Sequence, residues 1–371
     1  MPRHVLITGG AGFIGSHLAD DLIEHGYEVR VLDNLTPQVH GPEAEYPASL
    51  NPAVEFMRGD VRNPNDVRRA LEGIDAMFHL AAAVGVGQSM YEVAHYISVN
   101  THGTAVLLEG LLQHPVERLV VASSMSIYGE GLYRSADGQN YIPASRPLEQ
   151  LKAGAWELRD TRGAPLVPIP TPESKPPELS SVYALTKSDQ ERLCLMLGRA
   201  YSIPTVALRF FNVYGPRQAL SNPYTGVLAI FASRLLNNRP PLIFEDGNQM
   251  RDFVSVRDVA MACRLALTAP EAPGRVFNIG SGRPFSIREI ARKLAAVLGR
   301  NSTPVITGKY RMGDIRHCFA DITQAKQILG YSPRVNLEAG LVDLAQWLEG
   351  QSPCDRVEEA ATELESRGLT V

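Results

Sequence analysis

The feature that most constrains the fold is the alternation of short apolar segments with helical segments over the first third of the chain. The apolar runs HVLITGG, YEVRVLDN, VEFMRGDV, IDAMFHLAA and ERLVVASSMSIYG are separated by helical patterns that include FIGSHLADDLIEHG and NPNDVRRALEG. Parallel strands need a long crossover connection, usually a helix, so this order of elements indicates a parallel sheet. The chain is therefore predicted to be an α/β protein.

The chain is less regular after this alternation. A polar, proline-rich stretch at 131–178 interrupts it, and irregular segments of this length are usually functional or cover a site. A helix, SVYALTKSDQERLCLMLGRAY, and a strand, TVALRFFNVYG, follow, with strand-like returns at RDFVSV and GRVFNIG. We expect residues 1–208 to form one domain with returning segments near 250–280, and residues 209–350 to form a smaller interleaved lobe. Residues 351–371 are predicted to be a polar C-terminal tail, either a surface helix or frayed.

The composition excludes several classes of partner. With a net charge of −4, the chain lacks the excess of positive charge that nucleic acid or an anionic membrane would attract. The four cysteines are far apart, as in proteins with reduced thiols, and the nine histidines form no ligand-spaced cluster, so we expect neither disulfides nor a metal. We also expect no signal peptide and no membrane span. A cytoplasmic protein without nucleic acid or membrane partners is predicted.

A glycine-rich turn, TGGAGFIG, directly follows the first apolar run and opens a helix. Gly9, Gly12 and Gly15 allow a tight turn and close approach of the backbone to a pyrophosphate, whose charge is favoured at a helix N-terminus. The strand VRVLD then ends in Asp33, where an acid can bind both ribose hydroxyls of adenosine and repel a 2′-phosphate. The structural alternative for Asp33 is a turn cap. This pattern predicts a dinucleotide site that prefers NAD to NADP.

Two further strand ends carry residues that suit the same cofactor. Asp60 and Val61 end the run VEFMRGDV, where an adenine-contacting pair would lie. Leu80, Ala81 and Ala82 close the next run with residues that let the backbone approach the cofactor. Because ligands of open α/β sheets bind at the carboxyl ends of the strands, we expect these segments to converge on one site.

A tyrosine and a lysine in SVYALTK supply a candidate catalytic pair. Tyr183 and Lys187 are four residues apart and therefore lie on one face of the predicted helix. A lysine at this spacing, near the positive charge of a nicotinamide, would lower the pKa of the phenol and allow a phenolate base near neutral pH. Ser124, at the end of ERLVVASS, can hydrogen-bond the reacting hydroxyl and hold it against Tyr183. The structural alternative is a surface pair.

In this order, TGGAGFIG, Asp33, Asp60, HLAA, SSMSIYG, YALTK and RFFNVYGP resemble the motifs of the extended short-chain dehydrogenases/reductases, over about residues 4 to 350. The resemblance implies a Rossmann-type doubly wound parallel sheet with a smaller α/β C-terminal substrate lobe. It also implies bound NAD, a nucleotide-diphosphate sugar as substrate, and a homodimer packed through helices at about 100–113 and 181–201. The implied cofactor-binding residues are Gly9, Gly12, Phe13, Ile14, Gly15, Asp33, Asn34, Asp60, Val61, Leu80, Ala81, Ala82, Asn100, Tyr183, Lys187 and Phe210.

The same resemblance implies a substrate site. Asn212 matches a substrate-contacting asparagine, and Arg251 and Arg311 match arginines that bind phosphate and nucleotide, a task for which the guanidinium fork is suited. For Arg311 the alternative is a surface ion pair with Asp314. The segment LIFEDG, residues 242–247, is similar to one that lies along the base and ribose. The implied substrate-binding residues are Ser124, Ser126, Tyr183, Asn212, Phe244, Arg251, Arg311 and Asp314.

The residues after Ser124 distinguish two reactions that the resemblance allows. Epimerases and 4,6-dehydratases of this kind both begin with loss of the O4 proton to the tyrosine while hydride leaves C4. Dehydratases typically continue with an Asp-Glu pair, but this chain has Met125 and Ser126 there. Methionine has no titratable proton, and a serine hydroxyl is a weak acid and base, so elimination is disfavoured. The catalytic set Ser124, Tyr183 and Lys187 therefore favours a 4-epimerase.

The substrate is less constrained than the reaction. The run from RFFNVYGPRQ to LIFEDG and the insertion containing Trp156 are most similar to dTDP-L-rhamnose 4-epimerases, which interconvert dTDP-L-rhamnose and dTDP-6-deoxy-L-talose. ELRDTRG replaces a cysteine pair that many of them carry. UDP-glucuronate 4-epimerases usually have Arg-Pro-Asp where this chain has Ala219, Leu220 and Ser221. A UDP-glucose, UDP-N-acetylhexosamine or UDP-glucuronate 4-epimerase is the alternative. A 4,6-dehydratase or a non-catalytic NAD-binding protein is less favoured.

Overall fold

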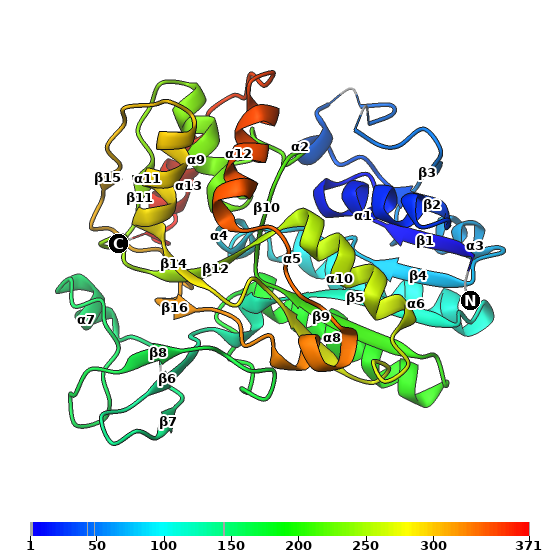
Figure 1. Cartoon of the computed structure of the whole chain (residues 1–371), viewed down its shortest axis with the longest axis horizontal. Coiled ribbons are helices and arrows are strands. Elements are labelled where there is room, and N and C mark those ends of the chain that lie inside the picture. Colours follow the sequence, from blue (N-terminus) through cyan, green and yellow to red (C-terminus); the bar gives the residue numbers. More distant parts are fainter. Residues whose placement is uncertain (1–2, 43, 48, 144, 371) are drawn as a thin grey trace.

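The computed structural model describes residues 3–42, 44–47, 49–143 and 145–370 (Figure 1). Its centre is a parallel sheet of seven strands in the order β3-β2-β1-β4-β5-β9-β13. This order confirms the predicted Rossmann-type doubly wound fold. The strands are β1 (His4–Thr8), β2 (Glu28–Asp33), β3 (Glu55–Arg58), β4 (Ala76–His79), β5 (Arg118–Ser124), β9 (Thr205–Phe210) and β13 (Val276–Ile279).

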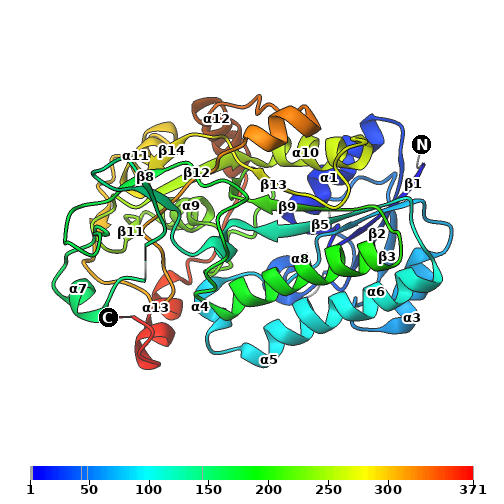
Figure 2. The ribbon, with the colours of Figure 1, turned by 90° about the horizontal axis from the view of Figure 1, so that it is seen from below.

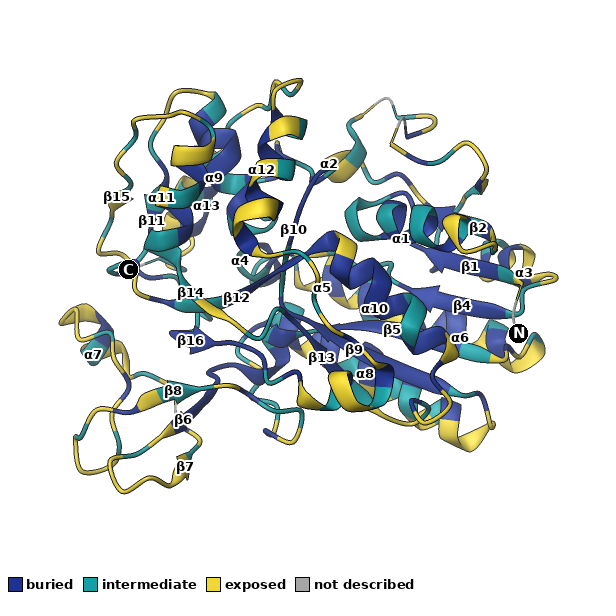
Figure 3. Ribbon diagram, in the orientation of Figure 1, coloured by how far each residue is buried: buried dark blue, intermediate teal, exposed yellow. Residues whose placement is uncertain are grey.

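Helices cover both faces of this sheet (Figure 2). One face carries α1 (Phe13–Glu24) and α10 (Val256–Thr268), and the other carries α3 (Pro64–Leu71), α6 (Gly103–Gln113) and α8 (Val182–Ala200). Successive strand residues point to opposite faces, so Val5 and Ile7 pack in the core beneath α1, whereas Leu6 packs in the core beneath α6. Burial on both faces explains why these strands read as nearly continuous apolar runs (Figure 3).

A second region follows the central sheet along the chain and packs around its own core, which includes Phe231, Leu294 and Leu341. One of its sheets joins β10 (Asn212–Tyr214), β12 (Met250–Ser255), β14 (Pro284–Ser286) and β16 (His317–Cys318), and another pairs β11 (Leu242–Ile243) with β15 (Val305–Ile306). Its helices are α9 (Val227–Leu236), α11 (Ile287–Val297) and α12 (Leu337–Leu348). Between these elements, α10 and β13 return to the central sheet.

The proline-rich insertion is ordered over its described residues and forms a small unit at the edge of the molecule (Figure 1). Its three antiparallel strands, β6 (Leu132–Arg134), β7 (Asn140–Tyr141) and β8 (Val167–Ile169), are accompanied by α7 (Leu148–Lys152). Tyr133, Leu158 and Leu166 form its core. Within ELRDTRG, the carboxylate of Asp160 accepts the backbone N–H groups of Arg162 and Ala164 and closes a tight turn.

Short elements complete the chain. They are α2 (Pro37–His40), α4 (Val86–Ser89), α5 (Val93–Tyr96), the π-helical turns at Ile97–His102 and Ala325–Leu329, and the 3₁₀ turn at Met125–Tyr128. The four cysteines are unpaired, and three of them are buried. Among the described residues, no helix is long and apolar enough to cross a membrane.

Of the two alternatives predicted for the polar C-terminal segment, a surface helix or a frayed tail, the structure has a helix, and one side of it is buried. The segment forms α13 (Val357–Ser366), in which Ala360 and Leu364 are buried. Beyond this helix, the N–H of Met312 donates to the carbonyl of Leu369, and Arg311 pairs with Thr370 in an isolated bridge. The segment is held because the glutamates of α13 occupy one side of the helix while its few apolar side chains share the other.

Candidate active site

A cavity of about 760 Å³ lies where the carboxyl ends of the central strands face the second region. This position is the usual ligand site of an open α/β sheet. The structure brings almost every residue predicted for cofactor or substrate to this one cavity, and Asn100 is the exception. The predicted residues that line it are Gly9, Gly12, Phe13, Ile14, Gly15, Asp33, Asn34, Asp60, Val61, Leu80, Ala81, Ala82, Ser124, Ser126, Tyr183, Lys187, Phe210, Asn212, Phe244, Arg251, Arg311 and Asp314.

The glycine-rich turn leaves the N-terminus of α1 open to the cavity. Gly9 has φ +70°, and a Cβ there would lie 2.8 Å from the backbone of Ala81. A Cβ on Gly15 would lie 2.5 Å from the carbonyl oxygen of Gly9, so the helix can approach the turn only without side chains. No side chain caps the helix at Gly12. Its first N–H groups and positive dipole end therefore suit a pyrophosphate.

Asp33 ends β2 beside this turn and is nearly buried, at 9 % exposure. Its Oδ2 accepts the N–H of Ala11 at 3.1 Å, and its Oδ1 accepts the N–H of Leu35 at 2.9 Å. The carboxylate of Asp33 therefore both caps the turn and lines the cavity. Each oxygen has further acceptor capacity for a ribose hydroxyl. Together with the open helix terminus, this donor and acceptor set fits the adenosine diphosphate half of NAD.

Asp60 lies at the next strand end and is tied to a neighbouring cation. Arg62 donates from Nε to Oδ1 at 2.9 Å and from a terminal nitrogen to Oδ2 at 2.7 Å, and Asn34 donates to Oδ2 at 3.1 Å. The hydrogen bonds from Arg62 hold the pKa of Asp60 down at about 2 despite partial burial. Asp60 is therefore a fixed anion at the rim of the cavity, and Arg62 is a partner that the sequence pattern did not identify.

Ser124 and Tyr183, two of the predicted catalytic residues, lie at the end of β5 and at the start of α8. Ser124 Oγ accepts the hydroxyl of Ser126 at 2.9 Å and the N–H of Ser126 at 3.2 Å. Ser124 also lies close enough to Tyr183 to act on the pKa of its phenol. Ser181 caps α8 by accepting the N–H of Ala184, and Ser89 accepts the N–H of Tyr183 at 3.0 Å. The start of α8 is thereby anchored beside the end of β5.

Lys187 lies one turn further along α8 and is buried. Its Nζ donates to Oε1 of Gln190 at 2.5 Å, and burial lowers its pKa to about 8. Gln190 in turn donates to Thr104 at 2.9 Å. Gln190 is thus a positioning residue that sequence reasoning missed. Its spacing of three residues from Lys187 on the same helix is the signal that could have identified it.

Burial raises the pKa of Tyr183 in the structure, with Ser124 acting in the opposite direction. The lowering of this pKa by Lys187 and a nicotinamide charge stays a prediction. Asn100, a predicted cofactor residue, is fully buried behind the residues that line the cavity, and its role toward the cofactor also stays a prediction. Its Oδ1 accepts the N–H of Ala83 at 2.7 Å, and its Nδ2 donates to the carbonyl of Ala83 and to Thr186. Asn100 therefore supports the cavity wall from behind.

The predicted substrate residues form the opposite wall from the glycine turn. Arg311 and Asp314 form an ion pair at 2.9 Å, as the alternative interpretation of Arg311 predicts. Both side chains nevertheless line the cavity. The Arg311 guanidinium also lies 4.7 Å from the ring centroid of Phe244. Arg251 donates to the carbonyls of Met250, Ile315 and Arg316, which orients its charge. The buried Oδ1 of Asn212 has no partner among the described residues, as expected of an atom that binds a ligand.

These features define a dinucleotide-binding enzyme of the short-chain dehydrogenase/reductase type, whose cavity extends to the second region. The model of the NAD dependent epimerase/dehydratase family matches residues 5–151 and 161–280. The chain belongs to this family.

Individual relatives agree with this assignment. The chain is 37 % identical to a dTDP-L-rhamnose 4-epimerase of Burkholderia thailandensis over 93 % of this chain and 95 % of the relative. Among solved structures, a Thermus thermophilus UDP-glucose 4-epimerase in complex with NAD has 31 % identity, a TM-score of 0.74 and coverage of 94 % and 100 %. A Thermotoga maritima UDP-glucose 4-epimerase with UDP-glucose has 32 % identity, a TM-score of 0.76 and coverage of 94 % and 99 %. The predictions of an NAD-dependent enzyme of sugar-nucleotide epimerase type, and of NAD as cofactor, are confirmed.

Proposed function

We propose that the protein is a nucleotide-sugar 4-epimerase that interconverts dTDP-L-rhamnose and dTDP-6-deoxy-L-talose. The observation that carries the choice of reaction is the end of β5. Ser124 and Tyr183 both line the cavity, and the next two cavity residues after Ser124, Met125 and Ser126, carry no carboxylate. Removal of a C5 proton and expulsion of a 6-hydroxyl need an acid and a base, which this position lacks.

The catalytic residues supply proton transfer at the sugar O4 atom. Tyr183 accepts the proton of the O4 hydroxyl in one direction and returns it in the other, because it lines the cavity with Ser124 and its backbone is fixed by Ser89. Ser124 orients that hydroxyl, and the buried Lys187 provides positive charge one helical turn away. NAD, when bound, supplies the reversible hydride chemistry at C4. Gly9, Gly12, Gly15 and Asp33 would hold it.

Epimerisation also requires that the sugar turn over while its diphosphate stays bound. Apart from Lys187, the Lys and Arg side chains that line the cavity are Arg251, Lys309 and Arg311, and all three come from the second region. Arg251 is held by backbone carbonyls, and Arg311 is held by Asp314. Both can therefore retain the diphosphate at one end of the cavity. Lys187 is engaged by Gln190, and Tyr96, which packs edge-on against Tyr183, is uncharged. An uncharged neighbour at this point of the subsite favours a neutral hexose over a uronate.

The relative from Burkholderia thailandensis supports the dTDP-6-deoxy-L-hexose pair as substrate. UDP-glucose and the other UDP-hexoses remain the alternative, because the two epimerases of known structure act on or bind UDP-glucose by their descriptions. To test the function, the purified protein is incubated with a panel of dTDP- and UDP-sugars, and products are identified by NMR. We expect the C4 epimer of dTDP-L-rhamnose. A 4-keto-6-deoxy product would contradict the epimerase assignment.

We further propose that the protein is a homodimer, and the cytoplasmic location stays a prediction. The helices α6 and α8 lie side by side on one face of the molecule (Figure 2). They expose Leu112, Leu185 and Met196, of which Met196 is 63 % exposed. Paired apolar helices of this kind can form a bundle with a second copy. Light scattering should give twice the chain mass, and Met196→Glu should shift the protein toward the monomer. A wild-type protein that is monomeric at micromolar concentration would contradict the proposal.

A further inference from the structure

The C-terminal helix α13 forms part of the cavity although it lies beyond the residues that match the family model. Val357, Ala360, Ala361, Leu364 and Glu365 line the cavity. Four of these five side chains are apolar, and Leu364 is 4 % exposed. The nearest charged group of the helix, Glu365, is held by an ion pair with Lys309. The face that α13 presents to the cavity is therefore mainly hydrocarbon.

On one side, α13 contacts the loop next to the catalytic tyrosine. A Cβ on Gly87 would lie 3.4 Å from both methyl groups of Leu364, so these residues are in close contact. Gly87 belongs to α4, whose last residue, Ser89, accepts the N–H of Tyr183. Arg367 lies over the ring of Tyr91 at 4.4 Å. Leu364 is thus joined to the residue that carries the proposed chemistry through one short helix.

A second set of contacts leads from α13 to the same tyrosine. The hydroxyl of Tyr91 is 2.6 Å from that of Tyr224. A Cβ on Gly85 would lie 3.0 Å from Cβ of Tyr224 and 2.9 Å from the hydroxyl of Tyr96. Tyr96 packs edge-on against Tyr183 with ring centroids 6.5 Å apart. The helix, the tyrosines and α4 therefore enclose the space beside Tyr183.

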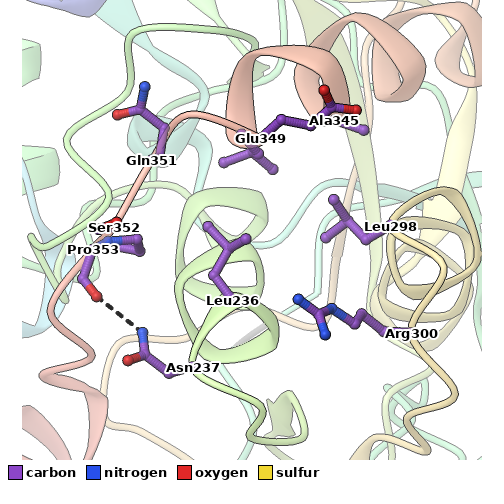
Figure 4. Close-up of a pocket in the computed structure, with 10 residues that line it drawn as sticks. Leu236, Asn237, Leu298, Arg300, Ala345, Glu349, Gln351, Ser352 and Pro353 are labelled. Carbon is purple, nitrogen blue, oxygen red and sulfur yellow. Dashed lines mark hydrogen bonds between the residues drawn. The ribbon is translucent and has the colours of Figure 1, made fainter.

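The helix is held firmly at its start. Asp355 accepts from Arg234 at 3.4 Å and from Arg239 at 3.3 Å. Just before it, the side chain of Asn237 donates to the carbonyl of Pro353 at 3.0 Å, where the segment crosses a hollow between α9, α11 and α12 (Figure 4). Anchors at Asp355 and at Arg311–Thr370 bracket α13, so its apolar face has a defined position.

We propose that α13 supplies the apolar wall of the sugar subsite and that Leu364 is a specificity-determining residue for an apolar substituent at C5 of the hexose. This inference rests on the proposed function and deepens it. The C6 methyl group of a 6-deoxyhexose would contact the apolar side chain of Leu364 without a loss of affinity. A hydroxymethyl group would place an unpaired hydroxyl against hydrocarbon, which reduces affinity, and hydrophobic pockets discriminate against an added hydroxyl by about a hundredfold at most.

The test compares two ligands that differ only in the C6 hydroxyl, dTDP-L-rhamnose and dTDP-L-mannose. Their dissociation constants are measured by calorimetry for the NAD-loaded wild type, Leu364→Asn and Leu364→Met. We expect the wild type to prefer dTDP-L-rhamnose by about tenfold to a hundredfold. Leu364→Asn should reduce this preference at least tenfold, and the volume-conserving Leu364→Met should retain it. The control is Thr362→Asn on the exposed side of the same helix, which should change nothing.

Affinity for dTDP alone separates the sugar subsite from the rest of the cavity. Leu364→Asn should leave it unchanged, because the proposal places Leu364 against the sugar and not against the nucleotide. Equal losses for dTDP and both sugars, or an unchanged preference in Leu364→Asn, would overturn the proposal. A wild type that binds both dTDP-sugars without epimerising either would instead contradict the proposed function, and the affinity ratio would still report on α13.

Discussion

The two walls of the cavity are built in different ways. The cofactor wall comes from consecutive strand ends of one apolar sheet, and its functional groups are largely backbone and glycine. The substrate wall is assembled from distant segments of the second region and the insertion, and buried ions hold it. Arg316, which is fully buried, pairs with Glu245 at 2.8 Å, Asp246 at 2.6 Å and Glu157 at 2.5 Å. Arg146 pairs with Glu245 at 2.8 Å.

This difference has a physical consequence. An apolar core tolerates conservative exchange, whereas a buried ionic network leaves uncompensated charges when one member is lost. The network joins the insertion, through Arg146 and Glu157, to the loop that carries Phe244 and to the segment after Arg311. The insertion therefore supports the substrate wall.

The largest expected effect lies where the two walls meet. Tyr183→Phe should reduce the rate of epimerisation by about 10² to 10⁴-fold, because it removes the proposed proton acceptor. NAD content after purification should be unchanged, since the glycine turn and Asp33 are untouched. Turnover is followed by NMR, with Tyr201→Phe, an exposed tyrosine at the end of α8, as the control. Activity within tenfold of the wild type would show that another group moves the proton.

The second prediction tests whether the buried ionic network of the substrate wall contributes to the stability of the protein. Arg316→Met should lower the free energy of unfolding by about 3–5 kcal/mol, because it removes the buried cation that Glu245, Asp246 and Glu157 share. Urea denaturation measures the change. Arg162→Met is the matched control, since the Arg162 side chain is 70 % exposed and its ion pairs should contribute less than about 1 kcal/mol. Similar stabilities for the two variants would mean that the network does not hold the substrate wall.

A third prediction addresses the cofactor wall alone. Asp33→Asn should weaken NAD binding by about tenfold to a hundredfold, because a hydrogen bond to a charged group contributes about 1.5–3 kcal/mol. It should also reduce the preference for NAD over NADP, while affinity for dTDP stays the same. The affinities are measured by equilibrium dialysis. The control is Asp343→Asn, because the Asp343 carboxylate is partly exposed and pairs with Arg257. Equal NAD affinity in all three proteins would place the ribose elsewhere.

The smallest effect is a difference in acid response. A hydrogen bond from His317 and ion pairing with Arg316 lower the pKa of Glu157 to about 2 from a usual value near 4.5. The folded state therefore binds fewer protons than the unfolded state between these values, so this contribution is complete above pH 4.5 and is lost as the pH falls toward 2. Glu157→Gln should make stability less dependent on pH in that window, and the exposed Glu359→Gln should not. Identical slopes would exclude the assignment.

The comparison of walls also explains what the sequence could predict. The parallel sheet, the glycine turn, Asp33 and the Tyr183–Lys187 spacing follow from local periodicity and from backbone requirements that short motifs express. The partners of the buried amide of Asn100, Ala83 and Thr186, could not be predicted, because they are set by tertiary packing. The Arg316 network joins residues far apart in the chain and has no local pattern.

The C-terminal helix could be predicted from the sequence only in part. Its glutamates led to the prediction of a polar tail, either a surface helix or frayed, and Val357, Ala360, Ala361 and Leu364 follow the spacing of an amphipathic helix in VEEAATELES. That apolar stripe was the available signal. Its burial could be recognised only once the cavity it faces was known.

The central claim, reversible oxidation at C4, is tested most directly with dTDP-L-rhamnose deuterated at C4 and incubated with the NAD-loaded protein in ordinary water. The account predicts that dTDP-6-deoxy-L-talose forms with the deuterium still on C4 and that, in a parallel reaction in D₂O, no deuterium enters C3 or C5. Loss of the label from C4, or entry of solvent deuterium at C5, would contradict it.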